Sequence, residues 1–209
     1  MAVASVLLIR HGITTWNADQ RWQGWTDVPL SPIGERQART ASAALTRLGH
    51  SFTRVVASDL ARARRTAALI APAVDIRIEA AWRERGVGDW SGLKTEEIEK
   101  KWPGALDSWR AGELDSPPGG EAESVFVPRV AAALAAAVEA AFRDLSPTLV
   151  VSHGGVIRTL ERHLGHAGRP IPNLSGRWFV WDGDKVVAGE HVDLLEHAPD
   201  GNRQTGTAL

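Results

Sequence analysis

The feature that most constrains this chain is a pair of apolar runs, each of which ends in a histidine followed by glycine. Residues 6–9 lead into Arg10-His11-Gly12, and residues 148–151 lead into Ser152-His153-Gly154-Gly155. Bounded apolar runs of this length are typical of buried strands. In open α/β sheets, ligands bind at the carboxyl ends of the strands. We therefore expect both histidines to lie at one sheet edge and to share a site.

Strand and helix signals alternate through the first part of the chain. Ser31 and Pro32 suit the N-cap and the first position of a helix that would end at Gly49. A strand over 52–57, a helix over 60–70 and a strand over 75–79 are expected to follow. This order predicts an α/β fold: a three-layer α/β/α arrangement around a mostly parallel, doubly wound sheet.

Residues 80–123 break this alternation and are interpreted as a small cap-like insertion over the carboxyl edge of the sheet, with too little core for a separate domain. An alanine-rich helix is predicted over 124–145, with Pro128 in or near its first turn because a deeper proline would cost about 3 kcal/mol. A helix over 156–164 and an antiparallel pair over 176–180 and 185–193, joined at Asp182-Gly183, complete a single domain over 1–195. Residues 196–209 are expected to form a flexible tail.

Composition excludes several classes of protein. The 209 residues carry a formal net charge of −1, which gives no electrostatic reason to expect nucleic acid or an anionic membrane as a partner. There is no cysteine, and therefore no disulfide, thiolate nucleophile or cysteine-based metal site. No signal peptide is apparent, and no apolar run approaches the roughly 20 residues that span a bilayer. We expect a soluble cytoplasmic protein, with a homodimer allowed but not required.

The residues at the strand ends are suited to binding an anion. Arginine presents a planar fork to phosphate or carboxylate, and Arg10 and Arg62 each follow a predicted strand. Without a Ser-Gly elbow, a phosphate-binding glycine loop or a cysteine, the available nucleophile is the imidazole of His11 or His153. A single histidine at a strand end is more often structural, however, and Arg-His-Gly alone is a weak signal.

The motifs taken together resemble those of the histidine phosphatase superfamily, the phosphoglycerate mutase-like proteins. The matching segments run in family order over roughly residues 3 to 195 and together are highly specific. They are Arg10-His11-Gly12-x-Thr14-x-Trp16-Asn17, Gln23-Gly24-x-x-Asp27-x-Pro29-Leu30-Ser31, Ser58-Asp59-Leu60-Ala61-Arg62-Ala63, Arg83-Glu84-x-x-x-Gly88-x-Trp90, Gly119-Gly120-Glu121 and Ser152-His153-Gly154-Gly155.

This resemblance implies a role for each matching residue. His11 would be the phosphorylated nucleophile, while Arg10, Arg62 and His153 would bind the phosphoryl oxygens. Glu84 would be the general acid and then the general base. Five further positions would support the phosphate or the substrate: Thr14, Asn17, Gln23, Gly24 and Gly154.

Simpler interpretations of three of these residues stay open. Thr14 could cap the following helix, and Asn17 could hold its loop. Glu84 could be a solvated partner of Arg83 or Arg85.

Two departures from the family pattern concern the surroundings of the site. Ile13 stands where glutamate is common, and Ala122 replaces the serine that usually follows Gly-Gly-Glu. Arg64 and Arg65 could suit an acidic substrate, although an exposed helical face explains them more simply. Trp22 and Trp25 could line a pocket or pack in a core.

The leading hypothesis is a metal-independent phosphomonoesterase that acts on small phosphorylated metabolites, without a cofactor or metal, through phosphorylated His11. A cofactor-dependent phosphoglycerate mutase needs the same five residues. The short segment Glu84-Arg85-Gly86-Val87-Gly88 and Gln23 resemble the phosphatases instead. A catalytically silent phosphate-binding module and a metal hydrolase are further alternatives. The sequence does not identify the substrate.

Overall fold

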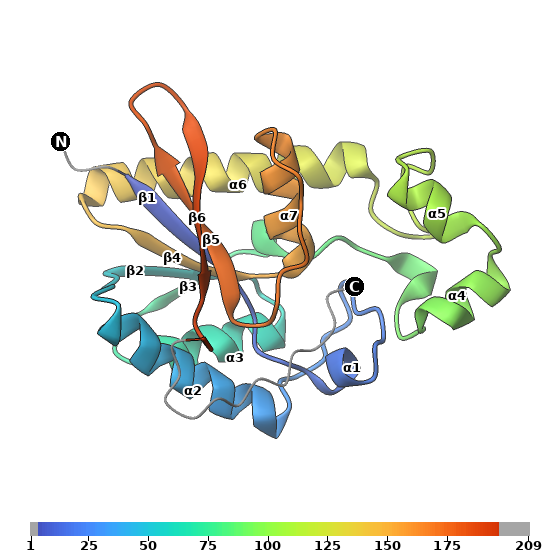
Figure 1. Cartoon of the computed structure of the whole chain (residues 1–209), viewed down its shortest axis with the longest axis horizontal. Helices are drawn as coiled ribbons and strands as arrows, with labels where there is room; N and C mark the ends of the chain where they lie inside the picture. Colours follow the sequence, from blue (N-terminus) through green and yellow to red (C-terminus); the bar gives the residue numbers. More distant parts are fainter. Residues whose placement is uncertain (1–3, 197–209) are drawn as a thin grey trace.

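A six-stranded mixed sheet in the order β3-β2-β4-β1-β5-β6 forms the middle of the protein (Figure 1). The computed structural model describes residues 4–196. Strands β3, β2, β4 and β1 are parallel, β5 is antiparallel to β1, and β6 is antiparallel to β5. The strands are β1 (Ser5–Arg10), β2 (Arg54–Ala57), β3 (Ile76–Ile78), β4 (Thr148–Ser152), β5 (Ser175–Trp181) and β6 (Val186–Asp193). The predicted α/β fold with a mostly parallel sheet is confirmed.

Helices cover both faces of the sheet (Figure 1). Because side chains alternate along a strand, Val6 and Leu8 of β1 face α6 (Glu123–Asp144) and α7 (Gly154–His163). Leu7 and Ile9 face the opposite side, where α2 (Pro32–Arg47) and α3 (Ala61–Ile70) pack. Every one of these four β1 side chains is fully buried. The continuous apolar run in the sequence therefore reflects a strand with a core on each face.

Local sequence signals account for most element boundaries. Ser31 caps α2, since its Oγ accepts a hydrogen bond from the Gly34 N–H at 3.1 Å, and Pro32 is the first helical residue. The turn at Asp182 also forms as predicted: its Oδ1 accepts hydrogen bonds from the backbone of residues 184 and 185. Helix α6 begins one residue earlier than expected, so Pro128 lies in its second turn. The strand predicted over 52–57 is shorter and begins at Arg54.

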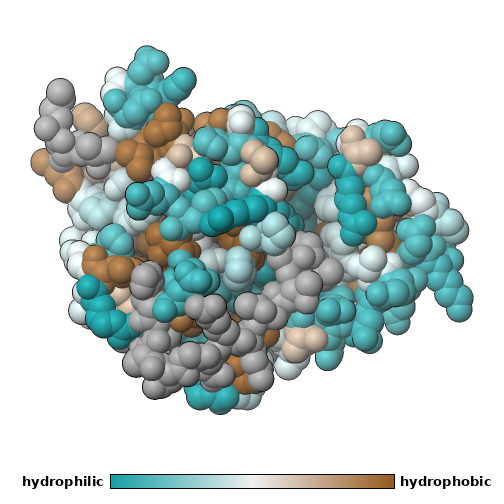
Figure 2. All heavy atoms as spheres, viewed as in Figure 1, coloured by the Kyte–Doolittle hydropathy of each residue, from teal (hydrophilic) through white to brown (hydrophobic). Residues whose placement is uncertain are grey.

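The segment between β3 and α6 forms the region at the right of Figure 1. It contains two short 3₁₀ turns, Ala80–Trp82 and Gly88–Trp90, and the helices α4 (Thr95–Lys101) and α5 (Ala105–Arg110). Its outer surface is mostly hydrophilic in the view of Figure 2. Five buried apolar side chains form its small core: Trp22, Val87, Trp90, Ile98 and Leu106. Trp22, Trp90 and Trp109 meet edge to face, with ring centroids 5.6–5.8 Å apart.

The tail predicted over 196–209 lies outside the described residues, apart from residue 196. By length and composition alone, helix α6 is long and apolar enough to cross a membrane. No such segment was expected from the sequence. Its buried residues belong to the core against the sheet. Core helices of soluble proteins can have the same length and composition.

Candidate active site

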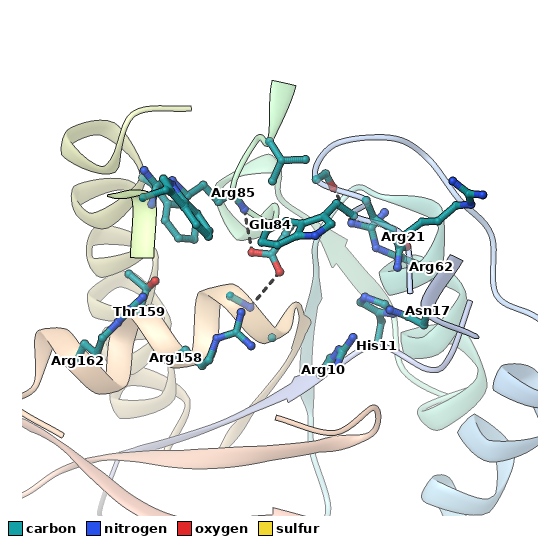
Figure 3. A pocket seen from close by; sticks show the side chains of 18 residues that line it. Arg10, His11, Asn17, Arg21, Arg62, Glu84, Arg85, Arg158, Thr159 and Arg162 are labelled. Carbon is teal, nitrogen blue, oxygen red and sulfur yellow. Dashed lines mark hydrogen bonds between the residues drawn. The ribbon is translucent and has the colours of Figure 1, made fainter. Parts of the chain in front are cut away.

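Eight of the ten predicted site residues line one pocket beyond the carboxyl ends of β1, β2 and β4 (Figure 3), whereas His153 and Thr14 are fully buried and do not line it. Adjacent strands bring them together: β1 ends at Arg10, β4 ends immediately before His153, and the turn after β2 leads to Arg62 on α3. The segment between β3 and α6 supplies Glu84 from the opposite side. The pocket measures about 740 Å³ when the open solvent at its mouth is included.

The His11 imidazole is held with one nitrogen available. Its Nδ1–H donates to the Gly12 carbonyl at 2.7 Å, which leaves the lone pair on Nε2. The side-chain amide of Asn173 fixes the backbone by donating to the His11 carbonyl at 2.8 Å. Burial, with the Arg62 and Arg10 cations beside it, holds the pKa of His11 well below its usual range. His11 is therefore a neutral imidazole at neutral pH.

His153 and Arg62 each carry a buried hydrogen-bonding atom that has no protein partner among the described residues. The hydroxyl of Ser58 lies 2.9 Å from His153 Nε2, and the rings of His11 and His153 have centroids 5.2 Å apart. His153 Nδ1 and Arg62 Nε are buried and make no hydrogen bond within the described chain. Burial first, and then the nearby cations, lower the pKa of His153. Buried polar atoms of this kind call for a ligand or water, because an unmade hydrogen bond is costly.

Backbone carbonyls orient the two arginines. Arg10 donates to the Ile171 carbonyl at 2.8 Å. Arg62 donates to the carbonyls of Thr26 at 2.8 Å and Gly24 at 2.7 Å. Burial lowers the pKa of each guanidinium to about 10, so both remain cations at neutral pH. Rigid, charged forks beside a neutral imidazole suit a phosphoryl group.

Glu84 lies at the N-terminus of α7, across the pocket from His11 (Figure 3). Its Oε1 accepts a hydrogen bond from the Arg85 N–H and its Oε2 one from the Gly155 N–H, both at 2.9 Å. A Cβ at position 155 would lie 2.1 Å from Glu84 Oε1, so only glycine leaves room for the carboxylate. A helix N-terminus stabilises negative charge, which explains why the carboxylate lies there.

The simpler interpretation of Glu84 as a partner of a neighbouring arginine side chain is wrong. Arg83 instead forms a bidentate pair with Asp59, at 2.8 and 2.6 Å. The Arg85 guanidinium donates to the Glu121 carbonyl and to the Glu123 carboxylate. The contact between Glu84 and residue 85 is made by the backbone N–H alone.

A support for Glu84 that the sequence did not reveal comes from α6. Arg129 donates to the carbonyls of Ala81 at 2.7 Å and Arg83 at 3.1 Å, and so holds the strand-like segment that carries Glu84. Glu121 pairs with the Arg129 guanidinium at 2.9 and 2.7 Å. Glu121, the acidic residue of the Gly119-Gly120-Glu121 motif, therefore helps to position Glu84 indirectly, through Arg129.

The residues expected to support the substrate divide into two groups. Asn17, Gln23, Gly24 and Gly154 line the pocket. Thr14 does not: it is fully buried, and its hydroxyl and the side chain of Asn17 form the capping box of α1 (Thr15–Ala18).

The tryptophans also differ from one another. Trp22 both packs in the small core and lines the pocket, whereas Trp25 is 46% exposed. The indole N–H of Trp25 donates to the Glu84 carbonyl at 2.7 Å, which adds a further fixed point to that segment.

The two departures from the family pattern lie at structural positions, and one of them is compensated by a neighbouring side chain. Ile13 is buried, and its carbonyl accepts hydrogen bonds from the N–H and Oγ of Ser31 at the start of α2. Ala122 is the N-cap of α6 but has no side-chain acceptor. Asp115 supplies it instead, since its Oδ1 accepts from the Glu123 N–H at 3.1 Å. Arg64 and Arg65 are exposed on α3, as the simpler interpretation predicts.

Sequence reasoning missed five polar residues that line the pocket, Arg21, Arg85, Arg158, Thr159 and Arg162, and three apolar ones, Val87, Trp109 and Phe126. A signal for two of them was present. Arg158 and Arg162 are four residues apart on the helix that starts after His153, and such residues share a helix face. The strand-end rule covers only residues next to a strand, so it does not reach them.

The two buried imidazoles are expected to make the protein less stable in acid. An unfolded histidine titrates near pH 6.5, whereas the folded-state pKa of His11 and His153 is well below that value. Below pH 6.5 the unfolded chain binds protons that the folded chain does not. The free energy of unfolding should therefore fall as the pH is lowered from 6.5 to 5, by up to about 1.4 kcal/mol per pH unit for each histidine.

Urea unfolding in phosphate-free buffer at several pH values measures this slope. His11→Ala should make the slope shallower, while His166→Ala, which removes an exposed histidine, should leave it unchanged. A slope that His11→Ala does not alter would contradict the burial of a neutral imidazole.

The comparisons with known proteins agree with this geometry. Residues 6–187 match the model of the histidine phosphatase superfamily (branch 1). The chain is 34% identical over 199 residues to the 2,3-bisphosphoglycerate-dependent phosphoglycerate mutase of Methylobacterium radiotolerans, covering 90% of this chain and 94% of that protein. It is 33% identical over 198 residues to the glucosyl-3-phosphoglycerate phosphatase of Mycobacterium tuberculosis, covering 85% and 88%. The structure of a mycobacterial glucosyl-3-phosphoglycerate phosphatase in complex with VO3 superposes with a TM-score of 0.74 at 29% identity, covering 88% of this chain and 96% of that one.

Proposed function

Because the chain belongs to branch 1 of the histidine phosphatase superfamily, we propose that it is a metal-independent phosphomonoesterase that acts through a phosphohistidine at His11. The observation that carries this proposal is the state of the pocket around His11. The Nε2 lone pair is available, and the unpartnered Arg62 Nε and His153 Nδ1 are buried beside it. A tetrahedral oxyanion is the group that this arrangement fits.

In the first step the Nε2 lone pair of His11 attacks phosphorus, and the bond from phosphorus to the ester oxygen breaks. Arg10, Arg62 and His153 stabilise the charge on the non-bridging oxygens. Glu84 donates a proton to the departing oxygen, so that an alcohol leaves instead of an alkoxide. The products of this step are the alcohol, phosphorylated His11 and the Glu84 carboxylate.

In the second step the Glu84 carboxylate accepts a proton from water while the water oxygen attacks the phosphoryl group. The bond between phosphorus and Nε2 breaks, which returns the neutral imidazole and releases inorganic phosphate. Glu84 is protonated again and the cycle closes. The same carboxyl group serves both steps because the leaving oxygen and the attacking water occupy the same side of phosphorus.

A phosphoglycerate mutase is the second candidate, since several similar proteins carry that name. It would use the same phosphohistidine but transfer the phosphoryl group to a second hydroxyl group instead of water. The short segment after Glu84 and the glutamine at position 23 favour the phosphatase. A silent binding module is a weaker candidate, because Arg10, His11, Arg62 and Glu84 line one pocket and the ring of His153 lies against that of His11.

The test is phosphate release from p-nitrophenyl phosphate and a panel of phosphomonoesters, with and without EDTA. We expect release at a rate that EDTA does not change. Loss of activity in EDTA and its return with zinc would show a metal hydrolase. Conversion of 3-phosphoglycerate to 2-phosphoglycerate, stimulated by 2,3-bisphosphoglycerate and faster than hydrolysis, would establish the mutase instead.

A further inference from the structure

The pocket contains more positive charge than one phosphoryl group requires. Six arginines line it, and Glu84 is the one carboxylate among the described lining residues. Two of the arginines are matched elsewhere: Arg21 pairs with Glu97 at 3.2 Å, and Arg85 pairs with Glu123 at 3.2 Å. Arg10, Arg62, Arg158 and Arg162 have no carboxylate partner within hydrogen-bond distance among the described residues.

Charge counting then points to a further acidic group on the substrate. A phosphomonoester dianion brings two negative charges into the pocket, and Glu84 brings none when it is protonated for its role as the general acid. Against the four guanidinium groups without a carboxylate partner, this leaves two positive charges without a counterpart. Arg158 is half-buried and Arg162 is exposed at the pocket, so both guanidinium groups can pair with an acidic group of a ligand.

The unmatched charge lies on one face of α7. Arg158 and Arg162 are four residues apart and therefore neighbours on the helix surface, with Thr159 beside them (Figure 3). Neither guanidinium forms a hydrogen bond or ion pair with the residues that the structure describes. Every other arginine of the pocket is fixed by a carbonyl or carboxylate.

Arg158 adjoins the phosphoryl site. In Figure 3 its side chain reaches toward Glu84 and Arg10. Burial lowers the pKa of Arg158, the Glu84 carboxylate opposes this effect, and Arg162 adds to it. The positive charge of Arg158 likewise contributes to the lowered pKa of Arg10. Arg158 therefore lies close enough to interact electrostatically with Arg10 and Glu84 at the phosphoryl site.

We propose that Arg158 and Arg162 form a second anion subsite, which selects phosphomonoesters that carry a further carboxylate or phosphate group near the scissile phosphate. This inference rests on the proposed phosphomonoesterase activity and narrows its substrate class. Carboxylate and phosphate share the chemistry that a guanidinium fork recognises, and the experiment distinguishes them.

The test compares matched substrates. 3-Phosphoglycerate and glycerol 3-phosphate differ in a carboxylate, and fructose 1,6-bisphosphate and fructose 6-phosphate differ in a second phosphate. We expect the wild type to have a kcat/KM about 10- to 100-fold higher for the more acidic member of at least one pair, as loss of a charge-assisted contact implies. The pair with the larger ratio identifies the acidic group.

Substitution then assigns the preference to α7. Arg158→Gln combined with Arg162→Gln should reduce the ratio to about 1–3, with a smaller loss on p-nitrophenyl phosphate. Arg158→Lys, which keeps the charge but loses the fork, should retain part of the ratio. Arg64→Gln removes an exposed arginine from α3 and should leave the ratio as in the wild type. An equal loss on all substrates, or a wild-type ratio near 1, would overturn the subsite.

A binding measurement separates this inference from the proposed activity. If the wild type releases no phosphate from any ester, the phosphomonoesterase proposal fails, whereas the subsite can still be measured by calorimetry. His11→Ala protein should bind 3-phosphoglycerate or fructose 1,6-bisphosphate at least about 10-fold more tightly than its less acidic counterpart. Equal affinities within both pairs would overturn the subsite whatever the activity.

Discussion

Replacing His11 by alanine is expected to reduce phosphate release from p-nitrophenyl phosphate by about 10³-fold or more. Among the described residues that line the pocket, His11 is the one histidine, and its Nε2 carries a lone pair that no protein group occupies. Loss of the nucleophile removes the covalent route entirely, and only the electrostatic contribution of the remaining groups is left. Continuous release of p-nitrophenolate in the presence of EDTA measures the effect.

The matched control for this substitution is His166→Ala, which removes an exposed imidazole and should retain wild-type activity. Calorimetric titration with inorganic phosphate shows whether the pocket survives, since Arg10, Arg62 and His153 remain in the His11→Ala protein. Phosphate binding together with lost turnover would establish His11 as the nucleophile. Activity retained by His11→Ala would rule out the phosphohistidine mechanism.

Replacing Glu84 by glutamine is expected to slow hydrolysis of an alkyl phosphate such as glycerol 3-phosphate by about 10²- to 10⁴-fold. The amide cannot protonate an alkoxide. p-Nitrophenolate needs no proton to leave, so with p-nitrophenyl phosphate the first step should remain fast. The second step should slow for every substrate, because no carboxylate remains to accept the proton of water. Phosphorylated His11 should therefore accumulate.

Rapid-mixing kinetics detect this intermediate as a burst of about one p-nitrophenolate per active site, followed by slow turnover. The phosphorylated histidine should be labile to acid and stable to base, as a bond between phosphorus and nitrogen is. Glu139→Gln, on an exposed turn of α6, serves as the control for loss of a carboxylate. Equal losses on alkyl and aryl phosphates without a burst would contradict the assignment of Glu84.

The part of the site that follows strand ends was predictable from the sequence. His11 and His153 come directly after apolar runs, and parallel strands deliver such residues to one edge. Glu84 follows no strand, and only the family resemblance indicated its role. Its position depends on a glycine 71 residues away, whose N–H and missing side chain admit the carboxylate. No local pattern in the sequence encodes such a contact.

Other contacts that hold the site residues in place could not be predicted from the sequence for the same reason. Arg129 on α6 holds the segment of Glu84 through carbonyls 46 and 48 residues away, and Ser58 contacts His153 across 95 residues. The role of Thr14 could not be predicted from its residue type either: it was expected to support the substrate, but its hydroxyl caps α1. Capping was one of the two interpretations that the sequence allowed, and the direction of the side chain decides between them.

The tryptophan cluster beside the pocket has a consequence for how its specificity can change. Trp22 and Trp109 line the pocket and at the same time meet each other in the small apolar core of the segment between β3 and α6. Trimming either indole to admit a bulkier substrate would open a void where few other side chains can move in. On this side of the pocket, a substitution that changes the substrate range also lowers the stability of the fold. On the α7 side, Arg158 and Arg162 are not part of an apolar core. Substitutions there can change the substrate range at a smaller cost in stability.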